Sequence, residues 1–311
     1  MNNFTSASTF FLMGFTDIRE IQILHAVFFL PIYLAALFGN LLIITLITKD
    51  HCLHTPMYFF LKNLSFLDLC LISITVPKSI MNSLMNHNSI SFFGCVSQVF
   101  FFFLLATTEV ALLTVMSYDR YVAICLPLRY DVIMSHRSCV EMAASSWLSG
   151  GLNAILHTAS TFSIPMCGSP EVHQFFCDVP QLLSLTCSFN MGELVVIGIS
   201  LVFDFGCFVF IAISYIHIFS TVLKLSSRES RSKAFSTCLP HLLVVTLFLS
   251  SGFFAYLHSL PKSPSLLDLL ISVFYTVDMK MSLRKLRKKL KKILRARNIQ
   301  REKFDQLFFM K

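Results

Sequence analysis

Long runs of apolar residues, separated by short polar stretches, set the pattern of this sequence. Ile21–Thr48 has 28 residues without a formal charge, and a helix that crosses a bilayer needs about 20 apolar residues. Five more runs are comparably long and carry few charges: Met57–Ile80, Ser91–Ile124, Met142–Met166, Leu194–Leu223 and Ala234–Leu257. The pattern predicts an all-α membrane protein with six full membrane-spanning helices.

A seventh apolar segment, Leu266–Val277, has only twelve residues. As a helix it would measure about 18 Å, against a hydrocarbon core about 30 Å thick. The strongly basic stretch Lys280–Arg301 follows it directly. Such a stretch favours the cytoplasm, whereas the segment before it is too short to carry the chain there. We therefore expect six full spans and a shortened seventh.

The composition agrees with a membrane protein, because 55% of the 311 residues are hydrophobic and only 14% are charged. Soluble domains carry about 25% charged residues. The net charge of +8 would suit a nucleic-acid-binding protein, but 13 of the 25 lysines and arginines lie after Val277. A basic segment beside membrane spans is more typical of topology and of contact with anionic lipids. No nucleic-acid partner is expected.

The basic residues also predict the orientation of the chain. They concentrate in Thr48–Pro56, Asp119–Glu141 and Lys224–Lys233, whereas Met81–Gly94 and Pro165–Glu193 contain none. Cytoplasmic loops are enriched in Lys and Arg, so the N-terminus is expected outside the plasma membrane and the tail inside. The expected division is an extracellular N-terminus (1–22), a transmembrane bundle (23–277) and a basic amphipathic C-terminal tail (278–311).

Two features on the expected outer side suit an extracellular environment. Asn3-Phe4-Thr5 is an N-glycosylation acceptor, so Asn3 is expected to be glycosylated. Four cysteines lie in loops nearly free of Lys and Arg: Cys95, Cys167, Cys177 and Cys187. In an oxidising compartment they can form two disulfides, and the residues alone leave three pairings open.

The triplet Asp119-Arg120-Tyr121 closes the third predicted span. An arginine at the end of an apolar helix can simply anchor the helix at the membrane interface, and for a bare triplet this interpretation is favoured. The arginine can instead pair with the neighbouring carboxylate and swing toward a partner protein. The longer run Met116–Cys125, MSYDRYVAIC, favours this second interpretation.

That run resembles the signature of vertebrate odorant receptors, a branch of the rhodopsin-like G-protein-coupled receptors. Further stretches similar to the family follow in the same order: Gly39-Asn40, Leu53–Leu61, Leu67-Asp68, Ser214-Tyr215, Lys233–Cys238 and Ser272–Val277. The resemblance implies a seven-transmembrane receptor bundle. It also implies that the protein binds a small volatile odorant and activates a heterotrimeric stimulatory G protein of the olfactory type.

The resemblance implies roles for single residues as well. Arg120, once released from Asp119, would engage the G protein beside Tyr121, and Tyr215 would stabilise the open state of the receptor. The pairing of the outer cysteines implied by the family is Cys95 with Cys177 and Cys167 with Cys187.

Asp68 and Glu109 are ionisable residues deep in the second and third spans. A charge at that depth is expensive, so a functional role is the default hypothesis. The resemblance implies a polar cluster with Asn40, in which one carboxyl is protonated or a sodium ion binds, because two nearby carboxylates cannot both stay ionised without compensation. A structural hydrogen-bond network explains these residues equally well.

The resemblance places the odorant pocket beside the outer half of the third span. Four residues there form a stripe along the helix: Phe102, Phe103, Ala106 and Thr107. Such pockets are mostly apolar with a few polar groups. Asp204 in the fifth span is a candidate for binding an amine or hydroxyl, although pairing with a neighbouring helix is the favoured alternative. Phe254 and Tyr256 are weaker candidates, because a phenylalanine-rich membrane helix usually packs or faces lipid.

Histidines and catalytic patterns point to no further chemistry. His25, His157 and His241 lack the spacing of metal ligands and are expected to pack or form hydrogen bonds. The sequence has no nucleophile–base pattern, phosphate-binding glycine loop or paired zinc motif. An enzyme is therefore not expected, and no cofactor is implied.

The tail carries leucines at helical spacing, with cations between them: Leu283, Leu286, Leu290 and Leu294. This amphipathic pattern predicts a helix on the inner membrane surface, in contact with membrane lipids.

The join between Val277 and Asp278 departs from the family. Odorant receptors continue there through a proline-containing half-helix, so about fifteen residues, half a membrane-spanning helix, are missing. The gap predicts impaired signalling. It leaves as the alternative a non-signalling receptor-derived protein or a pseudogene-like product. Retention in the endoplasmic reticulum is then the alternative to the plasma membrane.

Overall fold

The computed structural model describes residues 9–250, apart from gaps at 14–18, 51–53, 86–87, 168, 173, 175, 188–190, 225–230, 233, 236–237, 240, 247 and 249. The predictions for Asn3, for Phe254 and Tyr256, for the segment Leu266–Val277 and for the tail 278–311 lie outside the described residues. The sixth predicted span, Ala234–Leu257, is described only in part, with helical residues between 234 and 250.

Five long helices form from the apolar runs: α1 (Arg19–Lys49), α2 (Pro56–Met85), α3 (Phe92–Cys125), α5 (His136–Thr161) and α7 (Met191–Lys224). Most begin and end within a few residues of the predicted spans. The fourth span differs most, because α5 begins before Met142 and ends before Met166. Its earlier start has a local cause: the Ser135 hydroxyl accepts a hydrogen bond from the Ser138 N–H, which caps the first turn.

The helices carry the apolar surface of a membrane protein. Among the described helices, α1, α2, α3 and α7 are long and apolar enough to cross a membrane. α5 is long enough, at 26 residues, but its serines, histidines and asparagine make it less apolar. Large side chains point away from the bundle, with Val202 74% and Phe205 67% exposed. Continuous apolar surface of this kind suits lipid better than water.

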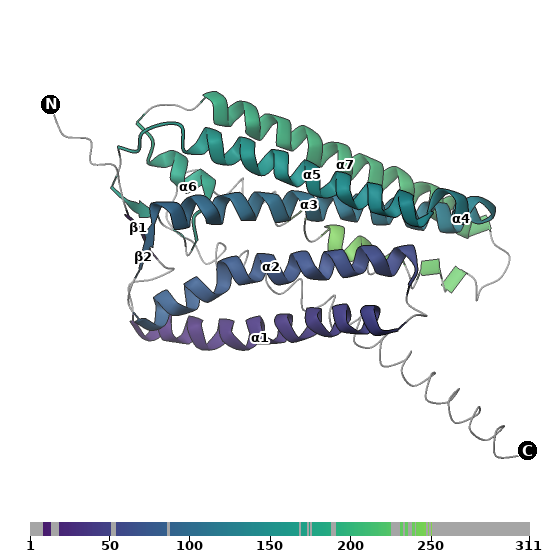
Figure 1. Ribbon diagram of the computed structural model, residues 1–311, viewed down its shortest axis with the longest axis horizontal. Helices are drawn as coiled ribbons and strands as arrows, with labels where there is room; N and C mark the ends of the chain where they lie inside the picture. Colours follow the sequence, from purple (N-terminus) through teal and green to yellow (C-terminus); the bar gives the residue numbers. More distant parts are fainter. Residues whose placement is uncertain are drawn as a thin grey trace, which may run out of the picture.

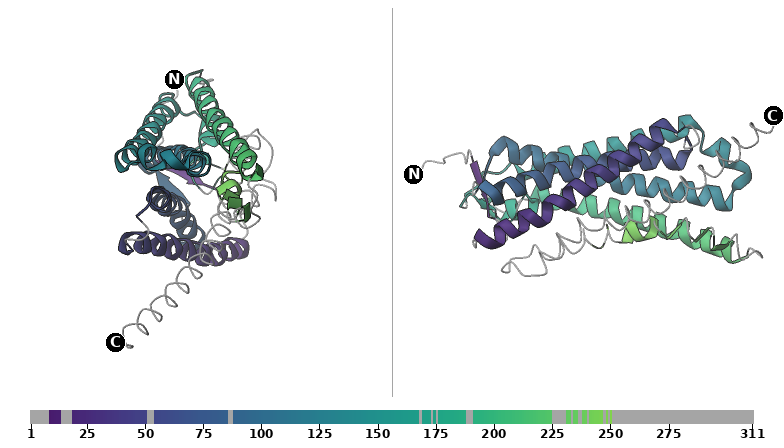
Figure 2. Two further views of the ribbon diagram at one scale, coloured as in Figure 1. Left: turned by 90° about the vertical axis from the view of Figure 1, so that its right-hand side faces the viewer. Right: turned by 90° about the horizontal axis from the view of Figure 1, so that it is seen from below.

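α3 lies at the centre of the bundle and contacts α2, α5 and α7 (Figure 1). The end-on view in Figure 2 places α1 and α2 on one side of α3, and α5 and α7 on the other. α5 approaches α3 most tightly at Gly150. A Cβ atom on Gly150 would lie 2.1 Å from the Thr108 hydroxyl oxygen and 2.5 Å from the Leu104 carbonyl oxygen. Only glycine permits this approach.

A small three-stranded sheet covers one end of the bundle, which we call the sheet end (Figure 1). β1 (Thr9–Leu12) pairs antiparallel with β2 (Ser89–Ser91) and parallel with β3 (Glu171–Val172). These strands are not among the elements predicted from the sequence. Their pairing buries Phe10 and Leu12 of β1 in a cluster with α6 (Val179–Ser184) and the top of α3.

The opposite end carries the loop between α3 and α5, and we call it the α4 end (Figure 1). This loop forms the short helices η2 (Pro127–Arg129) and α4 (Tyr130–Ile133). Met134, directly after α4, is buried against the ends of α2, α3 and α5. The loop is thereby held against the last two turns of α3, where Asp119 and Arg120 lie.

Candidate functional site

Asp119 and Arg120 form an ion pair in the last turns of α3, at the α4 end. The Arg120 Nε donates a hydrogen bond of 2.9 Å to the Asp119 Oδ2, and an η nitrogen of Arg120 contacts the same oxygen. The Asp119 carboxylate is 1% exposed. Tyr130 of α4 donates its hydroxyl proton to the Asp119 Oδ1 at 2.8 Å. Both carboxylate oxygens are therefore occupied, and Arg120 is held in place on the surface of α3.

Tyr130 is well suited to this contact. Burial, together with its hydrogen bond to Asp119, raises the pKa of Tyr130 well above the ordinary value for a tyrosine. The phenol therefore keeps its proton at neutral pH and donates it to the carboxylate. Tyr121 directly follows Arg120 on α3. Its ring stacks with that of Tyr118, with centroids 6.5 Å apart, and meets the ring of His217 of α7 edge-on, with centroids 5.9 Å apart.

Tyr215 of α7 is buried and bonded to His241, a described residue of the sixth span. The Tyr215 hydroxyl lies 2.8 Å from the His241 Nδ1, and the His241 Nε2 lies 3.1 Å from the Leu113 carbonyl oxygen. A carbonyl can only accept, so the His241 Nε2 donates to it, and in a neutral ring the Nδ1 then accepts from the Tyr215 hydroxyl. This chain of hydrogen bonds joins α3, α7 and the sixth span.

Asn40, Asp68 and Glu109 of the predicted polar cluster belong to α1, α2 and α3, respectively. Asn40 is 2% and Glu109 6% exposed, and Asp68 is close enough to Glu109 for their carboxyls to interact electrostatically. The Asn40 side-chain nitrogen has no hydrogen-bond partner within the described part of the chain. No group of three potential metal-ligating side chains occurs among the described residues. A bound sodium ion at Asp68 and Glu109 stays a prediction.

Residues of the predicted ligand stripe on α3 contact two different parts of the chain, α5 and the loop after it. Phe103 stacks on His157 of α5, with ring centroids 3.8 Å apart, and the Thr107 hydroxyl accepts a hydrogen bond of 2.8 Å from Asn153 of α5. Phe102 contacts Phe176 in the loop after α5, with centroids 5.8 Å apart. Phe103 and Thr107 therefore face α5, and Phe102 faces the loop. Ala106 is half-buried.

A continuous chain of hydrogen bonds, which we call the polar seam, extends from this stripe through α5 to α7. Asn153 accepts from Ser200 at 2.8 Å, and Ser200 bonds to the His157 Nε2 at 3.0 Å. The His157 Nδ1 lies 2.7 Å from a carboxylate oxygen of Glu193, and both side chains are fully buried. The other oxygen of Glu193 accepts from Ser160 and Thr161.

Most of the polar seam is not among the predicted site residues. Glu193 is the last residue of a predicted loop, and Asn153 and Ser200 are not among the candidates from the sequence. The signal that could have found the seam is the pair Asn153 and His157, one helical turn apart in a span free of charges. Asp204, the predicted polar group of the fifth span, lies one turn beyond Ser200 and interacts electrostatically with His157. Its carboxyl group has no hydrogen bond to the side chain of another described residue.

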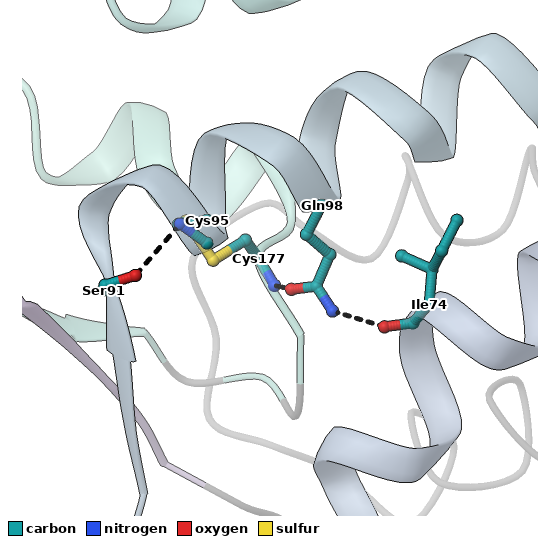
Figure 3. The surroundings of a disulfide bond; sticks show 6 residues. Ile74, Ser91, Cys95, Gln98 and Cys177 are labelled. Atoms are coloured by element: carbon teal, nitrogen blue, oxygen red, sulfur yellow. Dashed lines mark hydrogen bonds between the residues drawn. A yellow bond between two sulfur atoms is a disulfide. The ribbon is translucent and has the colours of Figure 1, made fainter.

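Two disulfides, Cys95–Cys177 and Cys167–Cys187, crosslink the sheet end. This is the pairing that the family resemblance implied. Gln98 supports the first of them (Figure 3). Its side-chain oxygen accepts from the Cys177 N–H at 2.8 Å, and its nitrogen donates to the Ile74 carbonyl at 3.0 Å. One side chain thus ties the loop after α5 to both α2 and α3.

Comparison with known proteins shows the family. The profile of the 7 transmembrane receptor (rhodopsin family) matches residues 39–279. Olfactory receptor 14A16 of Homo sapiens is 62% identical over 89% of this chain and 90% of its own length. Olfactory receptor 14J1 of Homo sapiens is 56% identical over 89% of this chain and 87% of its own length. The chain belongs to the olfactory receptors.

The fold of this olfactory receptor agrees with that assignment. Squid rhodopsin superposes with a TM-score of 0.67 over 86% of this chain and 81% of its own, at 19% sequence identity, which shows a shared receptor fold. The predictions of family and fold class are confirmed. The prediction that the chain is not an enzyme is confirmed by the same relatives, and they indicate a multi-pass plasma membrane protein.

Proposed function

We propose that this olfactory receptor binds small volatile odorants beside the α3 stripe and activates a stimulatory G protein of the olfactory type at its α4 end. The observation that supports coupling most directly is the ion pair of Asp119 with Arg120. Its arginine lies near the end of a central helix, and the contacts that hold it within the described part of the chain are made by the Asp119 side chain. An incoming partner that offers Arg120 a better acceptor can therefore displace it without unfolding the helix.

Ligand binding is proposed at the opposite half of α3. The stripe lies toward the sheet end, where it combines aromatic side chains with the Thr107 hydroxyl. This mixture of apolar walls and few polar groups is typical of small-molecule sites. Ligand and G protein would act on the two ends of one helix, and the Tyr215–His241 bond to the Leu113 carbonyl lies between them.

We also propose an orientation of the chain in the membrane and a role for two buried carboxyl groups. The sheet end is proposed to face the cell exterior, with Asn3 glycosylated and residues 1–22 outside, 23–277 in the membrane and 278–311 on the inner surface. The loops of the α4 end hold the basic residues expected inside. Asp68 and Glu109 are proposed to share a proton or a sodium ion. Asn40 is also buried, and its side-chain nitrogen has no hydrogen-bond partner among the described residues.

A second candidate is a receptor-derived protein that does not signal, held in the endoplasmic reticulum. The short run between Asp268 and Asp278 favours it, because nine uncharged residues cannot cross a bilayer. The two candidate functions differ in the amount of receptor at the cell surface and in the response to odorants, so one experiment separates them.

We expect cells expressing the full chain to raise cyclic AMP in response to at least one member of a broad odorant panel. The receptor is stained at the surface of unpermeabilised cells through an N-terminal epitope tag. Responses are normalised to that staining, with the human Olfactory receptor 14A16 expressed in parallel as a control for folding and transport. Absent surface staining with intracellular retention would support the second candidate. Surface staining without any response would contradict signalling.

A further inference from the structure

The polar seam joins three helices inside the half of the bundle that carries the ligand stripe. It consists of Asn153, His157, Ser160 and Thr161 of α5 with Glu193 and Ser200 of α7, and it ends on Thr107 of α3. Glu193, His157 and Thr161 have no exposed surface. A buried polar network whose members are all bonded holds its side chains in defined positions, because each broken bond leaves an unsatisfied group.

Two of the four stripe residues are positioned by this seam. The ring of Phe103 lies flat on His157, at 3.8 Å and an interplanar angle of 10°. The orientation of that imidazole is set by hydrogen bonds from both of its nitrogens, to Glu193 and to Ser200. The position of Phe103 therefore depends on α7, although no residue of α7 belongs to the stripe.

Thr107 is set by the seam in a different way. The Asn153 nitrogen donates to the Thr107 hydroxyl oxygen at 2.8 Å, and the Asn153 oxygen is occupied by Ser200. The Ser200 bond thus fixes the orientation of the amide, which must present its nitrogen to Thr107. A hydroxyl that accepts in this way keeps its own proton for donation. It is therefore suited to an acceptor such as a carbonyl oxygen.

We infer that the polar seam determines the ligand specificity of this receptor. The seam makes Thr107 a hydrogen-bond donor and thereby favours odorants with a carbonyl oxygen. Asn153, His157, Glu193 and Ser200 are positioning residues, which act through Thr107 and Phe103. Aldehydes, ketones and esters would then be preferred over hydrocarbons of the same carbon number. This inference rests on the proposed function, since it names the ligand class of the same site.

The test uses the substitution Ser200→Ala, which removes one hydroxyl and both of its hydrogen bonds in the seam. Its matched control is Ser145→Ala on α5, because the exposed Ser145 hydroxyl bonds only to the Glu141 carbonyl of its own helix. A second variant, His157→Phe, keeps a ring for Phe103 to stack on but loses the bonds to Glu193 and Ser200. Each full-length variant is assayed for cyclic AMP with carbonyl and hydrocarbon odorants matched in carbon number.

We expect the wild type and Ser145→Ala to prefer the carbonyl odorants. We define the preference as the ratio of the potency of the carbonyl odorant to that of the matched hydrocarbon. In Ser200→Ala and His157→Phe this ratio should fall roughly threefold to tenfold, as the loss of one neutral hydrogen bond predicts. An unchanged preference in Ser200→Ala would overturn the inference. An equal loss of potency for carbonyl and hydrocarbon odorants would overturn it too, as would a loss of surface receptor in Ser200→Ala alone. A silent wild type at the surface would overturn the proposed function as well, whereas a responsive wild type without the preference overturns the inference alone.

Discussion

Replacing Gly150 by alanine is expected to destabilise the bundle by about 3 kcal/mol, at the upper end of the usual cost of overpacking a core. The new methyl group would lie 2.1 Å from the Thr108 hydroxyl oxygen and 2.5 Å from the Leu104 carbonyl oxygen. Thr108 cannot move aside easily, because its hydroxyl is bonded to that same carbonyl at 2.6 Å. α3 and α5 would have to separate along their interface.

Gly151 provides the matched control for this substitution. It follows Gly150 in α5, but a Cβ atom there would meet nothing within 4 Å. Gly151→Ala should be neutral or stabilising by up to about 1 kcal/mol, since alanine favours helix over glycine. The midpoint of thermal unfolding can be followed with a thiol-reactive dye, because Cys139 is buried and forms no disulfide, so unfolding exposes its thiol. Equal midpoints for the two alanine variants would contradict the packing of α5 on α3.

Replacing Cys95 by serine is expected to remove most folded receptor from the cell surface. The Cys95–Cys177 bond closes a loop with a sequence separation of 82, and chain entropy gives such a loop about 4 to 5 kcal/mol of stabilisation. Both half-cystines are buried in the cluster that contains Phe10, Leu12 and Val172. The loss would therefore loosen the small sheet and the contact of Gln98 with Cys177 together.

The second disulfide allows a graded comparison. Cys167 and Cys187 are separated by 20 positions, for which the same entropy argument gives about 3 kcal/mol. Both residues are also exposed rather than buried. We expect Cys167→Ser to reduce surface staining less than Cys95→Ser, and Cys177→Ser to match Cys95→Ser. Surface levels in the opposite order would refute this account of the sheet end.

The long helices and the family could be predicted from the sequence because each depends on many residues. A run such as Ile21–Thr48 has one physical solution in lipid, a helix that satisfies its own backbone, and α1 covers the whole run. Several long motifs in one order identified the receptor family in the same way. The disulfide pairing followed from that resemblance, whereas the residues alone had left three pairings open.

The small sheet and the polar seam could not be predicted, because each depends on contacts between distant segments. β1 has only four residues, and it becomes a strand by pairing with Ser89–Ser91 and Glu171–Val172. Glu193 resembles a loop residue in the sequence. Its burial becomes favourable only when His157, Ser160 and Thr161 of α5 reach it. Periodicity within one segment contains no information about such partners.

The proposed function requires that ligand binding in this olfactory receptor release Arg120 toward a stimulatory G protein. The most direct measurement is agonist-dependent nucleotide exchange on that G protein, in membranes with equal amounts of receptor, for the wild type, Arg120→Ala and Arg137→Ala. Arg137 is an exposed arginine near the same end, paired with Glu141 on the surface. The account predicts exchange with the wild type and Arg137→Ala and none with Arg120→Ala. Agonist-dependent exchange that persists in Arg120→Ala, or its absence in the wild type, would contradict the account.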